Sequence, residues 1–102
     1  MNVNAEQLRV PLDGGFVMQL REGELESVAA GMREFDPAFD GSPVTLVAAV
    51  RALPVSDRAS LWELAVRRYG RRKPPEQAAA EIGMDTQRGQ ALLEAFSKAL
   101  TA

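Results

Sequence analysis

The sequence predicts a mainly α-helical fold, with an N-terminal β-hairpin and about five helices in a single domain over residues 1–102. Three observations support this prediction. Apolar residues alternate with a period of two up to residue 20, and they recur every three or four residues after it. A chain of 102 residues has the usual length for one hydrophobic core. The composition, 46% hydrophobic and 25% charged, is that of an ordinary soluble globular protein, and no apolar run approaches the ~20 residues of a membrane span.

Residues 7–20 have the pattern of a β-hairpin. The apolar residues fall at even positions on both sides of Asp13, Gly14 and Gly15, and either glycine can supply the positive φ that a three-residue loop needs. Closing this loop pairs three couples on one side: Leu12 with Phe16, Val10 with Met18 and Leu8 with Leu20. Pro11 falls on the other side, as suits an edge strand. Because a lone hairpin is marginal in water, its apolar face must cover helices of this chain or another copy.

From Glu24 the apolar spacing becomes helical, and the run stops before Pro37. Its apolar residues are Leu25, Val28, Ala29, Met32 and Phe35, and acids at its start suit the positive end of the helix dipole. These acids, like Asp36 and Asp40 further on, lack the spacing of a calcium loop and the partners of a catalytic pair. We therefore expect a solvated helix cap and loop there.

Two more helices are expected next. Ser42 before Pro43 resembles an N-cap before a first helical residue, and it opens a short, almost wholly apolar helix that we expect at the buried centre. Pro54 breaks the chain, and Ser56 or Asp57 can cap the helix that follows. The broad apolar face of that helix ends at Gly70 and contains Leu61, Trp62, Leu64, Ala65 and Tyr69.

The last two helices, over about residues 75–82 and 86–100, predict a C-terminal helix-turn-helix. Only Gly83, Met84 and Asp85 separate them. The glycine can take a left-handed conformation, the methionine can enter the core, and the aspartate can cap the following helix. A three-residue turn with glycine between two amphipathic helices is typical of this motif.

Charge and composition limit the functions to consider. Residues 1–42 hold three basic residues and eight acids, a net charge of about −5, whereas residues 43–102 hold nine basic residues and six acids, about +3. This asymmetry indicates that the two halves face different partners. The chain has neither Cys nor His, so thiolate nucleophiles, cysteine zinc sites and the commonest general base are missing. We expect no enzyme activity, no metal and no cofactor, and the segment from Met1 to Glu6 does not resemble a signal peptide, which favours a cytoplasmic protein.

The second half carries a further set of residues: Leu53, Pro54, Arg58, Leu61, Gly70, Glu76, Ala79, Gly83, the run from Met84 to Leu93, Lys98, Ala99 and Leu100. This set resembles region four of bacterial sigma factors, and residues 74–100 align with that pattern without a gap. The resemblance covers roughly the second half of the chain and none of the first. It implies a recognition helix that holds promoter or operator DNA, or a module that contacts RNA polymerase.

The sequence departs from the family pattern at two kinds of position. Gly89 stands where a branched apolar residue is usual, and it costs about 1 kcal/mol of helix propensity relative to Ala. Close contact between helices is the expected compensation. Gln90, Leu92 and Ser97 stand where basic residues are frequent, so the recognition helix itself offers only Arg88 and Lys98.

Nine residues are the candidate DNA-binding residues. Thr86, Gln87, Arg88 and Gln90 are of the types that read base edges from the first turns of a recognition helix. Phosphates would be held by Arg67, Arg68, Arg71, Arg72 and Lys73, a basic run with no acid between its members. A basic run at a helix end also complements the helix dipole, and glutamine and arginine on an exposed face are simply good helix formers.

Two functional hypotheses follow. The first is a transcription-related module without catalysis that binds DNA or RNA polymerase through the helix-turn-helix. The second is a protein interaction or dimerisation module, in which the helix-turn-helix is a scaffold and the acidic half docks on a partner or forms a homodimer through the hairpin. Net acidity and the unsupported hairpin favour the second hypothesis.

Overall fold

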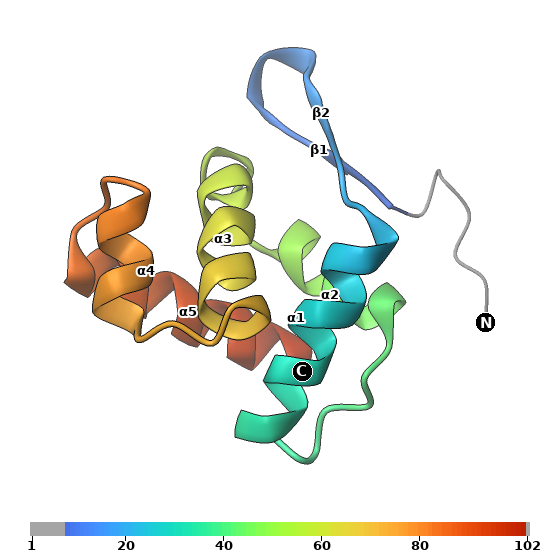
Figure 1. The fold of residues 1–102 in the computed structure, drawn as a ribbon. Coiled ribbons are helices and arrows are strands. Elements are labelled where there is room, and N and C mark those ends of the chain that lie inside the picture. Colours follow the sequence, from blue (N-terminus) through green and yellow to red (C-terminus); the bar gives the residue numbers. More distant parts are fainter. Residues whose placement is uncertain (1–7, 102) are drawn as a thin grey trace.

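The computed structural model describes residues 8–101 and has the predicted mainly helical architecture (Figure 1). The chain forms strands β1 (Arg9–Pro11) and β2 (Val17–Gln19), followed by helices α1 (Glu22–Phe35), α2 (Pro43–Ala52), α3 (Arg58–Ala65), α4 (Pro75–Glu81) and α5 (Thr86–Leu100). Short turns η1 (Asp13–Gly15) and η2 (Val55–Asp57) precede β2 and α3, and a π-helical turn, η3 (Val66–Gly70), extends α3. Among residues 8–101, no helix is long and apolar enough to cross a membrane.

The hairpin has the predicted register. Val10 pairs with Met18 in the antiparallel ladder, and the Leu12 amide donates to the Phe16 carbonyl at 2.8 Å. Both loop glycines have positive φ, 73° at Gly14 and 79° at Gly15. The residues at the base of the apolar face, Leu8, Val10 and Leu20, are buried in the core. Of the six apolar residues expected on one side of the hairpin, Phe16 is not covered by this chain: it is 72% exposed, because the tip of the hairpin extends beyond the helices (Figure 1).

Two arginines attach the hairpin to the helices through backbone carbonyls. Arg58, in the first turn of α3, donates to the carbonyls of Pro11 at 2.8 Å, Arg51 at 2.7 Å and Leu53 at 3.1 Å. Arg51 donates to the carbonyl of Arg9. The bonds to Arg51 and Leu53 satisfy carbonyls at the end of α2 that have no partner within the helix, and those to Arg9 and Pro11 hold β1. The base of the hairpin therefore belongs to this protein's own core.

Helix α2 lies between α1, α3, α5 and β1, which confirms its predicted central position. The capping predictions are only partly correct. Ser42 has the extended backbone of an N-cap, but its side chain makes no cap hydrogen bond. The carboxylate of Asp40 instead accepts from the Ser42 amide at 2.8 Å and from the Thr45 hydroxyl at 3.1 Å. At α3, Asp57 has the N-cap position without a side-chain cap bond, because its carboxylate faces Arg88.

Helix α1 and the turn η3 cross at very short range. A Cβ atom at Gly31 would lie 2.7 Å from the carbonyl carbon of Tyr69, so only glycine fits there. Beside this crossing, the Ser27 hydroxyl donates to the Gly70 carbonyl at 3.3 Å. Trp62 is buried as predicted, and its indole donates to Glu24 at 3.1 Å. Phe35, predicted on the core face of α1, is 53% exposed and packs edge-on against Tyr69.

Candidate nucleic-acid interface

The turn between α4 and α5 has the predicted helix-turn-helix geometry. Gly83 adopts a left-handed conformation with φ of 68°, and Met84 packs, partly buried, against the core. The Asp85 carboxylate accepts from the backbone amides of Gln87 at 3.0 Å and Arg88 at 3.3 Å. This cap fixes where α5 begins.

Gly89 allows the two helices of the motif to approach closely. A Cβ atom at this position would lie 3.1 Å from the Cβ of Ala79 on α4. That distance is tighter than ordinary van der Waals contact, so the close packing is the compensation for the low helix propensity of glycine.

The four candidate base-reading residues are all exposed, but they do not share one face of α5. Arg88 and Gln90 are two residues apart and therefore about 200° apart around the helix. Arg88 is directed toward Asp57, the last residue of η2 before α3, to which it donates at 3.1 Å. Gln90 lies on the side that Thr86 and Gln87 flank, and it lines a shallow groove of about 360 Å³ whose other residues are Arg68, Tyr69, Pro75, Leu93, Glu94 and Ser97. The structure thus groups three of the four residues and separates Arg88.

The basic run that was predicted to hold phosphates is largely occupied by contacts within the protein. Arg72 makes a bidentate pair with Glu34 on α1, with distances of 2.6 and 3.1 Å. The guanidinium of Arg68 stacks 4.2 Å from the ring centroid of Phe35 and donates to the Lys73 carbonyl at 3.1 Å. Only Arg71, among the five basic residues of the run, has no side-chain partner within the part of the chain that the structure describes.

The pair of Arg72 and Glu34 joins the loop before α4 to α1. Hydrogen bonding from Arg72 holds the pKa of Glu34 below its usual value, and the same bond raises the pKa of Arg72. Arg72 also has a positive φ of 56°, a conformation uncommon outside glycine. Both side chains are more than half exposed, so the pair contributes little stability, but it orients the loop.

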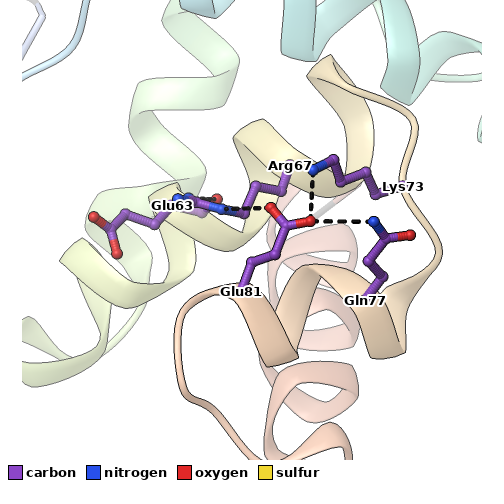
Figure 2. Close-up of polar contacts among 5 residues, drawn as sticks. All are labelled: Glu63, Arg67, Lys73, Gln77 and Glu81. Atoms are coloured by element: carbon purple, nitrogen blue, oxygen red, sulfur yellow. Dashed lines mark hydrogen bonds and ion pairs between the residues drawn. The ribbon is translucent and has the colours of Figure 1, made fainter.

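Arg67 and Lys73 converge on a single carboxylate, that of Glu81 at the end of α4 (Figure 2). Lys73 Nζ lies 2.5 Å from Oε2, Arg67 Nε lies 3.3 Å from Oε1, and the Gln77 amide donates to Oε2 at 3.3 Å. The hydrogen bond from Lys73 is the largest influence on Glu81, and with the neighbouring charges it holds the pKa of this carboxyl below its usual value, although burial opposes the shift. The carboxylate is therefore charged at neutral pH.

Sequence reasoning missed the acids that pair with the candidate cations. Arg88 pairs with Asp57, Arg72 pairs with Glu34, and Arg67 and Lys73 both pair with Glu81. Of these three acids, Glu81 alone had a signal in the local sequence, its i, i+4 spacing from Gln77.

A second shallow groove of about 370 Å³ lies between α1 and the start of α2. No three acidic side chains of residues 8–101 converge as metal ligands. Comparison of the chain with protein-family models, curated proteins and solved structures found no match.

Proposed function

We propose that the protein is a transcription-related, non-catalytic module that binds duplex DNA through α5, with RNA polymerase as the other partner that the sequence resemblance implies. The observation that carries the proposal is the exposed polar face of a capped, closely packed helix-turn-helix. Thr86, Gln87 and Gln90 present hydroxyl and amide groups there, and these groups match base edges in the major groove. Asp85 and the contact between Gly89 and Ala79 hold that face in place.

Arg71 is the residue of the basic run that is most available to a phosphate. It is exposed and free of side-chain partners within residues 8–101, whereas the other members of the basic run would have to exchange an internal contact for a phosphate. Because each neutralised phosphate contributes a slope of about −0.9 to log affinity against log salt, Arg71 alone would give about −1, and all five residues about −4 to −5. We expect the measured slope to lie between these limits.

The test is binding of random duplex DNA over a series of salt concentrations. We expect Arg71→Ala to flatten the slope by about 1, because one phosphate contact is lost. Arg21→Ala is the matched control: it removes the same charge from an exposed arginine in the acidic half, before α1. We expect no change in its slope. A wild-type slope near zero would contradict DNA binding.

A second candidate function is protein interaction through the tip of the hairpin. The observation that favours it is the pair of exposed apolar residues at the tip, Phe16 and Val17, together with the internal neutralisation of Arg67, Arg72 and Lys73. The base of the hairpin is already covered by α2, so within residues 8–20 the exposed apolar surface lies at the tip.

For this second function, replacing Phe16 and Val17 with Ser and Thr is expected to lower the molecular mass measured in solution by light scattering, because the apolar contact between copies is lost. The control is Arg71→Ala with Arg72→Ala, which leaves the tip unchanged and should leave the mass unchanged. A wild-type protein that is monomeric at all concentrations, with no change in the tip variant, would argue against dimerisation through the hairpin.

A further inference from the structure

Glu81 lies in a cationic site that one carboxylate does not fully satisfy. Two positive charges, on Arg67 and Lys73, face a single negative charge, and all three side chains are only 23 to 28% exposed. Arg67 Nε is buried and makes no hydrogen bond, since its 3.3 Å approach to Glu81 Oε1 lacks the required geometry. Leaving a buried donor without a partner costs free energy of folding. The two cations can therefore bind more acceptor oxygens than the carboxylate of Glu81 provides.

The residues of this site are those that bind phosphate groups in general. An arginine and a lysine make charge-assisted hydrogen bonds with carboxylate and phosphate oxygens alike. Phosphate has more acceptor oxygens than a carboxylate, and one of them could meet the unpartnered Arg67 Nε. Figure 2 shows the Gln77 side chain at the same carboxylate, where its amide adds a third donor.

The site lies on α4, the first helix of the motif, and in helix-turn-helix proteins the first helix crosses the DNA backbone. Glu81 is the last residue of α4, and the turn that follows leads directly to Thr86 at the start of α5. The carboxylate of Glu81 reaches back along α4, because Gln77, one turn earlier, and Lys73, before the helix, both donate to Oε2 (Figure 2). A phosphate bound here would thus lie against α4, the helix that packs on α5.

We propose that Arg67 and Lys73 form an anion site that Glu81 occupies in the free protein and that a DNA backbone phosphate takes in the complex. This inference rests on the proposed DNA-binding function. Glu81 is then an internal competitor that weakens non-specific binding, because every phosphate must displace a carboxylate that is already paired.

The decisive variant is Glu81→Gln, which keeps the shape of the side chain and removes the competing charge. We expect it to bind duplex DNA roughly tenfold more tightly at low salt and to steepen the slope of log affinity against log salt by about 1 to 2, because up to two cations become available. Glu76→Gln is the matched control, since Glu76 is an exposed acid on the same helix with no side-chain partner among the described residues. Adding Lys73→Ala to Glu81→Gln should abolish most of the gain.

Two results would overturn the inference. One is an affinity of the folded Glu81→Gln protein no higher than that of Glu76→Gln, which would leave Glu81 as a residue that only positions α4. The other concerns a variant that keeps the acid: Gln77→Glu places a second carboxylate at the site and should weaken DNA binding more than Ala80→Glu, an equal charge on an exposed position of α4. Equal effects would contradict competition at this site.

Titration with inorganic phosphate, followed by NMR of the Arg67 Nε–H signal, separates this inference from the proposed function. If Glu81→Gln responds to phosphate, wild type does not, and neither binds DNA, then the anion site exists and the DNA-binding function fails. If wild type binds DNA with a salt-dependent affinity and Glu81→Gln shows no gain, the function stands and the masked site fails. If neither protein responds to phosphate and neither binds DNA, both the anion site and the DNA-binding function are rejected.

Discussion

Replacing Gly31 with Ala is expected to destabilise the protein by about 3 kcal/mol, at the upper end of the range for overpacked sites. The new Cβ would lie 2.7 Å from the carbonyl carbon of Tyr69 and closer still to its oxygen. Both are backbone atoms and cannot rotate aside, so α1 and η3 would have to separate. The gain in helix propensity of about 1 kcal/mol is too small to offset this.

Gly23→Ala is the matched control for this prediction. It makes the same change in the same helix, but a Cβ there meets nothing within 4 Å. We expect a neutral effect or a stabilisation of up to about 1 kcal/mol. Urea unfolding followed by circular dichroism measures both free energies. An unfolding midpoint of Gly31→Ala equal to that of wild type would show that the crossing accommodates a methyl group.

The Gly31 crossing also bears on the candidate interface. The turn η3 contains Arg67 and Arg68, and it leads into the loop with Arg71 and Arg72. Moving η3 away from α1 would therefore strain the pair of Arg72 and Glu34. Under the proposed DNA-binding function, a Gly31→Ala protein that remains folded is expected to bind DNA with altered affinity, although no residue of the interface has changed.

Phe96→Ala is the second substitution with a large expected effect, a destabilisation of about 3 to 5 kcal/mol. Phe96 is fully buried, and it belongs to α5, which packs against α2, α3 and α4. Truncating the ring leaves a cavity where these helices meet, and the lost contacts cannot be replaced without moving the helix that carries the polar face. Thermal unfolding of the variant should therefore begin at a clearly lower temperature.

Phe16→Ala is the control of the same residue type. Because its ring is 72% exposed at the hairpin tip, we expect a change in stability within about 0.5 kcal/mol. Equal destabilisation by the two substitutions would mean that the hairpin tip is covered in solution, which would in turn favour the protein interaction hypothesis.

Secondary structure was predictable because its signals are local. The even spacing of apolar residues around Gly14 and Gly15 predicted the register of the hairpin, and all five helices formed where the three- and four-residue spacing indicated. The turn before α5 was predicted in detail, since the left-handed glycine, the core methionine and the capping Asp85 act within a few residues of one another.

What periodicity did not predict is which side chains this chain covers. Phe16 and Phe35 have the periodicity of core residues, yet both are exposed. Periodicity predicts which face of an element a residue lies on, but it does not predict how far the neighbouring element extends over that face. Ser42 and Asp57 have residue types that cap helices, but neither side chain makes a cap hydrogen bond. At Asp57 a tertiary contact outweighed the local preference, because its carboxylate pairs with Arg88, 31 residues further along the chain.

The sequence by itself therefore determined the order and limits of the elements, the helix-turn-helix and the identity of the candidate binding residues. The tertiary structure alone decided their availability: it placed Arg88 against Asp57, Arg72 against Glu34, and both Arg67 and Lys73 against Glu81. The physical reason is distance along the chain. Arg72 and Glu34 are 38 residues apart, and only the packing of α1 on η3 brings their charges together.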